Sequence, residues 1–304
     1  MRLLITGAGG MLGINLCLQQ APHHSITALT LNAPLRGASF DSYPIDITDF
    51  PKLLNLLEKV RPDAVVHCAA MADVDLCEKQ PQIARMVNSE ASGKLAEWCS
   101  KQSVRLVHIS TDAVFDGVKG NYTEADIPNP LSVYARTKLE AERNVAAVHP
   151  QAIIARVNFY GFSPSGKRSL AEFFLNSLRS GSTVQGFDDV YFCPLYVGHL
   201  AEMIMAMLER ELFGLFHVVS PGMLTKFEFG RKIANQFHLS ADLIKPISVK
   251  ESGLIAQRSQ NLTLRIDKLI NALGTTPADV DVGIGALFKA EQIGLPKIIK
   301  EMAG

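Results

Sequence analysis

Tyr134 and Lys138 form the pair of residues best suited to chemistry. They are spaced i, i+4, so on a helix both side chains project from one face. A phenol with a pKa of about 10 exchanges protons poorly at neutral pH, whereas a neighbouring ammonium favours the phenolate and lowers that pKa. The spacing therefore predicts a tyrosine that transfers a proton, with the lysine as its electrostatic partner. The alternative interpretation is an exposed helix pair without a chemical role.

A hydroxyl-bearing residue, Thr111, follows an apolar run at residues 104–109 that is typical of a buried strand. Its hydroxyl can hydrogen-bond to a reacting carbonyl group and stabilise negative charge on the oxygen. Together with Tyr134 and Lys138, it predicts acid–base chemistry at a carbonyl group.

Glycines recur near the start of the chain, at Gly7, Gly10 and Gly13, directly after a short apolar run at residues 3–6. Gly7 would permit a tight turn, Gly10 would let a pyrophosphate approach the backbone, and Gly13 would let a helix pack closely on a sheet. The pyrophosphate would then lie on the N–H groups at the helix start. The pattern predicts a dinucleotide site, and a plain glycine-rich turn is the alternative.

Strand-like and helix-like segments alternate along the first half of the chain, and these elements must position the residues above. Strands are expected at residues 3–6, 26–31, 63–70 and 104–109, and helices after Asp49 and over residues 84–101. Repeated strand–helix–strand units produce right-handed crossovers and a doubly wound parallel sheet. The sequence therefore predicts an α/β Rossmann fold.

The alternation ends near residue 157, where Gly, Pro and Ser become frequent. We expect a dinucleotide-binding domain over residues 1–156, to which residues 193–222 return. Residues 157–192 and 223–304 then form a smaller C-terminal α/β substrate-binding region. Ligands of such folds bind outside the carboxyl ends of the strands, so this region should close over that edge.

Composition narrows the class of ligand. The 304 residues carry 30 basic and 30 acidic side chains, which favours a small-molecule ligand over nucleic acid or an anionic membrane surface. No apolar run approaches the roughly 20 residues of a membrane span, and a cytoplasmic protein is predicted. The five cysteines show no paired spacing and the eight histidines are scattered, so we expect reduced thiols and no metal site.

These motifs resemble those of the extended short-chain dehydrogenases/reductases. The resemblance rests on Thr-Gly-x-x-Gly-x-x-Gly at residues 6–13, Ser-Thr at 110–111 and Tyr-x-x-x-Lys at 134–138. Within that family the chain is similar to the dTDP-4-dehydrorhamnose reductase branch, and the similarity covers nearly the whole chain. The segments that carry it are residues 62–70, 73–78, 87–88, 110–117, 214–217, 225–229 and 258–269.

The resemblance implies that NADPH or NADH reduces a keto group on a nucleotide-linked 4-keto-deoxysugar. Tyr134 would protonate the carbonyl oxygen, Lys138 would hold the nicotinamide ribose, and Thr111 would orient the carbonyl. The expected cofactor contacts are Gly7, Gly10, Met11, Leu12, Gly13, Asn32, Arg36, Asp46, Ile47, Ala69, Ala70, Tyr134 and Lys138. The expected substrate contacts are Val74, Thr111, Asp112, Asn158 and Arg258. A helix asparagine, Asn88, is either structural or functional.

The cofactor preference is predicted from the segment at residues 31–36. An acid about 20 residues beyond the glycines holds the ribose 2′-hydroxyl of NAD, whereas a basic group accommodates the 2′-phosphate of NADP. This segment has no acid but contains Asn32 and Arg36. NADP is therefore slightly favoured, with Arg36 as its 2′-phosphate contact or, alternatively, as a solvated loop residue.

Ala113 departs from the branch, which usually has a tyrosine after Thr-Asp. The change removes an aromatic wall expected against the substrate, so the particular sugar stays open. A 4,6-dehydratase generally has a carboxylate there, which disfavours that activity, and an epimerase is a weaker alternative. Residues 67–70, 91–93 and 214–246 also resemble the regulatory beta subunit of methionine adenosyltransferase, so a non-catalytic binding module remains an alternative. A homodimer is left open.

Overall fold

A seven-stranded, all-parallel sheet forms the centre of the computed structural model, which describes residues 1–251 and 259–304. The strand order is β11-β6-β5-β4-β1-β2-β3. The strands are β1 Arg2–Thr6, β2 Ser25–Thr30, β3 Asp41–Pro44, β4 Ala64–His67, β5 Arg105–Thr111, β6 Ile153–Val157 and β11 Gly214–Val218. The predicted doubly wound sheet is confirmed.

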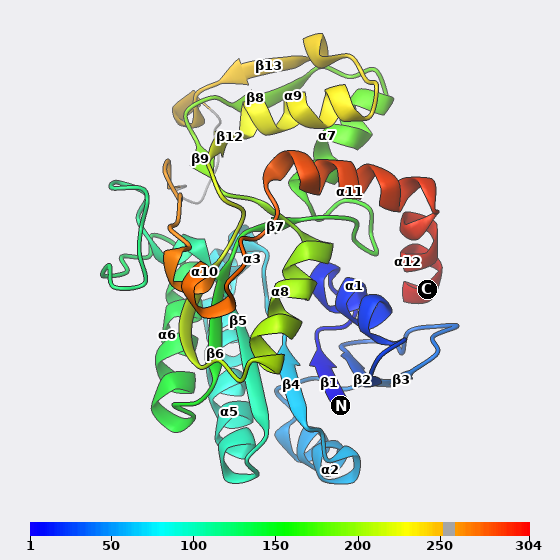
Figure 1. Ribbon diagram of the computed structural model, residues 1–304, viewed down its shortest axis with the longest axis vertical. Helices are drawn as coiled ribbons and strands as arrows, with labels where there is room; N and C mark the ends of the chain where they lie inside the picture. The colour runs from blue at the N-terminus through cyan, green and yellow to red at the C-terminus, as the bar shows by residue number, and fades with distance from the viewer. Residues whose placement is uncertain (252–258) are drawn as a thin grey trace.

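Helices cover both faces of the sheet because successive side chains of each strand point to opposite sides. Leu3 and Ile5 pack with helices α1 (Met11–Gln20) and α8 (Val197–Glu209). Leu4 packs on the other face, with helices α2 (Phe50–Val60), α5 (Ala91–Lys101) and α6 (Val133–Val148). The arrangement of helices around the sheet is visible in Figure 1.

Two predicted elements end or bend where polar contacts intervene. The strand expected over residues 63–70 stops at His67, and Asn88 holds the loop beyond it through the backbone of Met71. The helix expected over residues 84–101 comprises α4 (Pro81–Arg85), a π-helical turn at Met86–Glu90 and then α5. Such π turns occur frequently at functional sites, and this one carries Asn88.

The C-terminal region gathers beyond the carboxyl ends of the sheet strands, where Figure 1 shows β8, β13, α7 and α9 together. Strands β8 (Val184–Phe187) and β13 (Ile244–Ile247) pair in parallel. Helices α7 (Leu170–Arg179) and α9 (Lys226–Gln236) each begin with a capping box. The segment over residues 193–222 supplies α8 and β11, and β11 pairs with β6 at the edge of the central sheet.

The remaining elements are short or lie near the chain end. Helix α12 (Leu295–Ala303) returns to the N-terminal half, where the Arg36 N–H donates to the carbonyl oxygen of Met302 at 2.7 Å. The others are α3 Val74–Lys79, β7 Phe159–Tyr160, β9 Tyr191–Phe192, β10 Leu195–Tyr196, β12 Leu224–Thr225, α10 Asp267–Leu273 and α11 Val280–Gln292. Across residues 1–251 and 259–304, no helix has the length and apolar character needed to cross a bilayer.

Candidate active site

The turn between β1 and α1 requires glycine at two positions. Gly7 has a φ of +66°, and a Cβ there would lie 2.7 Å from the Cα of Ala69. A Cβ on Gly13 would lie 2.3 Å from the carbonyl oxygen of Gly7. The tight turn and the close packing predicted for these glycines are therefore present, because any larger residue would push the turn and the helix apart.

The N-terminus of α1 fits an anionic ligand. Gly10 is its N-cap, no side chain accepts from the first turn, and that turn contains no acidic residue. Gly9 and Gly10 are exposed. The N–H groups of Met11, Leu12 and Gly13 begin a 10-residue helix whose dipole favours negative charge at this end. Helices α7 and α9 have side-chain caps instead. The cradle thus suits the pyrophosphate of a dinucleotide.

The residues expected around the adenosine lie along one edge of the sheet. Asn32 and Arg36 are exposed in the loop after β2, and Asp46 and Ile47 follow β3. Asp46 accepts hydrogen bonds from the N–H and hydroxyl of Thr48, at 2.9 and 2.8 Å. Ile47 is buried.

Arg36 lies next to the C-terminal residues of the chain, which its predicted role as a 2′-phosphate contact did not lead us to expect. Its guanidinium lies beside Gly304, and it lines a cavity of about 370 Å³ formed by the loop after β2 together with α1 and α12. Its contact with a 2′-phosphate stays a prediction.

Asn88 ties the loop after β4 to helix α6. Its side-chain carbonyl accepts from the N–H of Met71 at 2.7 Å, and its amide donates to the Met71 carbonyl at 3.2 Å and to the Thr137 hydroxyl at 3.0 Å. Asn88 is fully buried. It therefore fixes the segment containing Ala69 and Ala70 against the helix that carries the tyrosine–lysine pair, which is a structural role.

Lys138 is buried at the sheet surface, one helical turn from Tyr134. Its ammonium donates to the carbonyl oxygen of Ile109 at 2.6 Å and lies 3.4 Å from Nε2 of His108. Ser132 is the N-cap of α6, and its hydroxyl accepts from the N–H of Ala135 at 3.2 Å. The helix thereby presents both side chains to the carboxyl end of β5, as the spacing predicted.

The electrostatics of the pair differ from the expectation. Burial raises the pKa of Tyr134 to about 12, and the hydrogen bond with Thr111 opposes that rise only in part. The prediction that Lys138 brings this pKa toward neutrality is therefore wrong for the protein alone, because desolvation of the phenolate dominates. Burial also lowers the pKa of Lys138 to about 8. Tyr134 is consequently a protonated acid throughout the neutral range.

Asp112 and Asn158 form a second polar pair beside Thr111. The Asn158 amide donates to a carboxylate oxygen of Asp112 at 2.6 Å, and the Thr111 hydroxyl donates to the other at 3.1 Å. Asp112 is buried, and this burial raises its pKa to about 6 despite both hydrogen bonds. The backbone N–H of Ala113 also donates to the Thr111 oxygen, at 3.2 Å, so Thr111 is held in place from two sides.

A cleft of about 150 Å³ brings several predicted residues together. Tyr134, Asn158 and Val74 line it, as does Ala113, which stands where the resemblance leads us to expect a tyrosine. The other lining residues are Leu131, Ser132, Val190, Tyr191, Phe192, Lys226, Ser259 and Leu262. Arg258, the expected diphosphate partner, lies outside the described residues.

Lys226 is a cleft residue that sequence reasoning missed. It is the first residue of α9, after the cap residue Thr225. A lysine in the first helical turn opposes the helix dipole, and its placement directly after a capping threonine was a readable signal of a role other than helix stability. Lys226 also favours the ionised form of Asp112, so it brings positive charge to the cleft.

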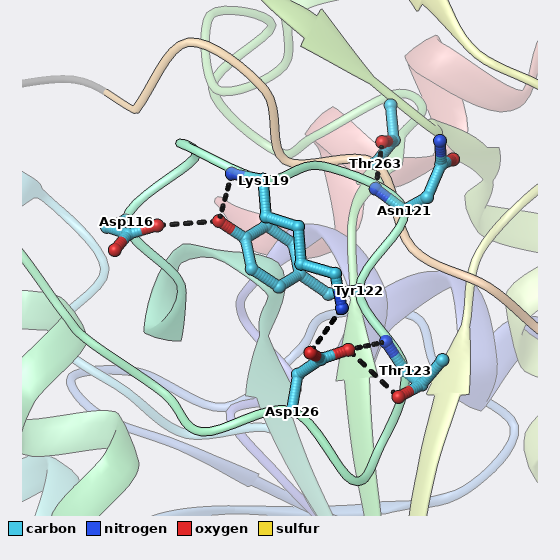
Figure 2. A network of polar contacts seen from close by, with 7 residues as sticks. All are labelled: Asp116, Lys119, Asn121, Tyr122, Thr123, Asp126 and Thr263. Atoms are coloured by element: carbon cyan, nitrogen blue, oxygen red, sulfur yellow. Dashed lines mark hydrogen bonds and ion pairs between the residues drawn. The ribbon is translucent and has the colours of Figure 1, made fainter.

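One wall of the cleft is braced by the loop after β5. Figure 2 shows Tyr122 at the centre of this loop: its hydroxyl donates to Asp116 at 2.6 Å and accepts from the N–H of Lys119 at 3.1 Å. The N–H of Asn121 donates to the hydroxyl of Thr263 at 2.6 Å. The loop thus holds the segment over residues 259–264, from which Ser259 and Leu262 reach the cleft. Asp126 closes the loop by accepting from Thr123 and pairing with Lys119.

Known proteins share this architecture over nearly the whole chain. A relative from Haloferax volcanii, a probable low-salt glycan biosynthesis reductase Agl14, is 33% identical over 298 residues, covering 95% of this chain and 98% of its own. The mouse methionine adenosyltransferase 2 subunit beta is 31% identical over 278 residues, covering 88% of this chain and 81% of its own.

A solved structure agrees with the sequence relatives. The dTDP-4-dehydrorhamnose reductase of Bacillus anthracis in complex with NADP superimposes with a TM-score of 0.84 at 26% identity, covering 95% of this chain and 98% of that chain. The model of the RmlD substrate binding domain family matches residues 1–293. With the glycine cradle, the tyrosine–lysine pair and the cleft in place, the chain belongs to the RmlD substrate binding domain family.

Proposed function

We propose that the protein is an NAD(P)H-dependent oxidoreductase that reduces a keto group on a nucleotide-linked 4-keto-deoxysugar. One observation carries the proposal: Tyr134 lines a cleft at the carboxyl end of the sheet, with Thr111 bonded to it and Lys138 buried one turn along the same helix. Its relatives include a reductase and an NADP-bound dTDP-4-dehydrorhamnose reductase. When bound, NADPH or NADH supplies a hydride.

The chain's own residues would orient the substrate and supply the proton. Tyr134, whose pKa of about 12 keeps it protonated, would donate its proton to the carbonyl oxygen as negative charge develops there. Thr111 would donate a hydrogen bond to the same oxygen once its hydroxyl turns away from Asp112. The Lys138 ammonium would stabilise the resulting phenolate and hold the nicotinamide ribose. Asn158 and Lys226, which also line the cleft, would contact the substrate.

The two parts of the chain would bind different ligands at this site. Residues 1–156, with residues 193–222, would hold the dinucleotide on the central sheet. Residues 157–192 and 223–304 would bind the nucleotide sugar, since Tyr191, Phe192 and Lys226 line the cleft from that region. The proposed substrate is accordingly a nucleotide sugar, and cytoplasmic residence and a homodimer remain predictions.

NADPH should be used at least as well as NADH. The loop after β2 contains no acid at residues 31–36, so a 2′-phosphate meets no fixed negative charge there. Paired dissociation constants for NADPH and NADH, in the parent and in Arg36→Ala, test this preference and the proposed contact. A strong selectivity for NADH would contradict it.

Oxidation of NADPH and NADH by the purified protein, followed against several nucleotide-linked 4-keto-sugars, tests the activity itself. Reduction that depends on both the sugar and Tyr134 supports the proposal. The second candidate is a non-catalytic regulatory subunit, favoured by the 31% identity to the mouse methionine adenosyltransferase subunit. A protein that binds dinucleotide yet reduces none of the sugars, and in which Tyr134→Phe changes nothing, would favour that candidate. An epimerase would instead interconvert sugars without net consumption of the dinucleotide.

A further inference from the structure

A buried row of polar side chains crosses the sheet beneath helix α6. Ser110 of β5, Arg156 of β6 and His217 of β11 are register partners, so their side chains emerge on the same face. Arg156 is 3% exposed and His217 is fully buried. Apolar side chains fill most of this face. Buried polar side chains here therefore require hydrogen-bonding partners on the helix that covers the face.

Glu142 of α6 is the partner that joins this row to the helix. Its carboxylate accepts from Nε and Nη2 of Arg156 at 2.9 and 2.7 Å, a bidentate pair, and from the hydroxyl of Ser110 at 2.5 Å. The Glu142 side chain is 6% exposed. The three side chains therefore form one connected unit with little access to solvent.

This unit connects α6 and β5, which carry the predicted catalytic residues, with β6, the strand that leads to Asn158. Glu142 lies one helical turn beyond Lys138 on α6, Ser110 directly precedes Thr111 on β5, and Arg156 of β6 lies two residues before Asn158. The Arg156 guanidinium also lies 4.9 Å from the ring centroid of Phe115, which stacks on Tyr122 at 4.1 Å. The unit thus reaches the loop that braces the cleft.

We propose that the Glu142–Arg156 pair, with Ser110, is a positioning device that sets the mutual placement of Thr111, Lys138 and Asn158. The inference rests on the proposed reductase function. Its three residues touch neither substrate nor cofactor and act through their neighbours. Stability alone is a weak reason for such a pair, because replacing a buried ion pair by apolar residues is often neutral or stabilising. A displacement of about 1 Å in a site, in contrast, can cost about 100-fold in rate.

Glu142 also acts on the charge of Lys138. The ammonium faces His108 and His67 from the sheet, Cys68 from the loop after β4, and Glu142 from its own helix. The histidines are buried and remain neutral, and burial raises the pKa of the Cys68 thiol to about 12. The Glu142 carboxylate favours the charged form of Lys138. Replacing Glu142 by an uncharged residue would remove this stabilisation of the ammonium.

The test compares Glu142→Met, Arg156→Met and the double variant with the parent. Each single change leaves one buried charge unpaired, so Tm should fall by about 10 °C. The double variant removes both charges and should recover most of that loss. Its kcat should nevertheless stay about 30-fold or more below the parent, and the alkaline limb of its pH profile should move to lower pH. Arg85→Met with Glu140→Met, a more solvent-accessible ion pair that joins α4 to α6, should behave like the parent.

A double variant with parental kcat and an unmoved alkaline limb would overturn the proposal, because the pair would then be structural only. If the double variant fails to fold, Ser110→Ala provides a milder test, because it removes only the hydrogen bond between β5 and the Glu142 carboxylate. It should lower kcat about 3- to 10-fold with only a small loss of Tm, since Arg156 still pairs with Glu142, and a parental kcat would overturn the proposal.

Failure of the proposed function has a different signature. If the parent binds NADPH but reduces no keto-sugar, the proposed reductase function is wrong. The positioning proposal is then tested by the dissociation constant for NADPH. The double variant should then show a dissociation constant raised at least about 10-fold, because Lys138 is displaced, while the Arg85/Glu140 control keeps the parental value. An unchanged constant in the double variant would overturn the positioning role.

Discussion

The carbonyl oxygen of Ile109 accepts a 2.6 Å hydrogen bond from the ammonium of Lys138. This bond joins helix α6 to strand β5 two residues before Thr111. With His108 at 3.4 Å as a second neighbour, two of the three donors of the ammonium face the protein. The third could bind the ribose of a bound dinucleotide, which is the role the resemblance implies for Lys138.

Lys138→Met should separate function from stability. Burial lowers the lysine pKa to about 8 from 10.5, so the folded state disfavours the ammonium. That cost, about 3 kcal/mol at most, is present below pH 8 and disappears as pH rises toward 10.5, where the unfolded chain also loses its proton. We expect Lys138→Met to keep or raise Tm at pH 7, to lower kcat at least about 100-fold and to weaken NADPH binding. Thermal unfolding and calorimetric titration of the two proteins check this, and an unchanged dissociation constant would remove Lys138 from the cofactor site.

Tyr134→Phe should abolish proton donation and leave the cradle intact. The phenol lines the cleft, and a positioned acid contributes about 100- to 10,000-fold to a rate. We expect kcat to fall within that range while the NADPH dissociation constant stays within about 2-fold of the parent. Single-turnover measurements with a keto-sugar, beside titration of the cofactor, provide the comparison. Parental turnover would exclude Tyr134 as the proton donor.

Thr111→Val removes the hydroxyl of this residue and keeps the shape of its side chain. The Thr111 oxygen accepts from Ala113 and donates to Asp112, and valine would leave both groups without that partner. We expect kcat to fall about 10- to 1,000-fold, with Thr111→Ser recovering most of it because the hydroxyl is restored. If the valine and serine variants show equal rates, the hydroxyl has no part in the reaction.

The sequence predicted the doubly wound sheet, four of its seven strands and the glycine turn after β1, because these signals are local. Apolar runs specify buried parallel strands. Gly13 is required by backbone contacts with Gly7 and Ala8, and the turn at Gly7 requires a positive φ. Strand β3 was missed because its residues Asp-Ser-Tyr-Pro lack the apolar run of a buried strand, and Pro is tolerated there only at a sheet edge.

The missed parts of the site arise from contacts between residues distant in sequence. Arg156 is a single charged residue in an apolar segment, and only the strand register and Glu142 on α6 reveal its partners. The pKa of Tyr134 was misjudged for the same reason. Its neighbour in sequence predicted a decrease, whereas burial by the surrounding elements produces an increase.

Gly13→Ala and Gly9→Ala form a matched pair in the cradle. A Cβ at Gly13 would overlap the Gly7 carbonyl oxygen at 2.3 Å, whereas a Cβ at Gly9 would meet the Thr30 side chain at an ordinary 3.8 Å. We expect Gly13→Ala to lower Tm and to weaken NADPH binding at least about 10-fold, because α1 must shift away from the turn. Gly9→Ala should keep the parental Tm. Equal behaviour of the two variants would contradict the close packing described above.

The pH dependence of kcat/KM should show two limbs, set by Asp112 and Lys138 and not by Tyr134. Burial raises the pKa of Asp112 to about 6 and lowers that of Lys138 to about 8, whereas Tyr134 titrates near 12. Below pH 6 the Asp112 carboxyl gains a proton and can no longer accept from both Asn158 and Thr111, so the cleft loses its fixed geometry. Above pH 8 the Lys138 ammonium loses its charge, and with it the stabilisation of the Tyr134 phenolate.

Asp112→Asn resolves the two limbs. An amide does not titrate in this range, so the variant should lose the acid limb and retain the alkaline limb. The maximum of kcat/KM should be lower, because an amide NH₂ replaces one carboxylate oxygen and would face the donor of Asn158 or Thr111. Profiles of kcat/KM from pH 5 to 10 for parent and variant provide the measurement, with NADPH stability corrected at each pH. An acid limb that persists in Asp112→Asn would assign it to another group, and an alkaline limb displaced toward pH 10 or above would mean that Lys138 keeps its charge in the working enzyme.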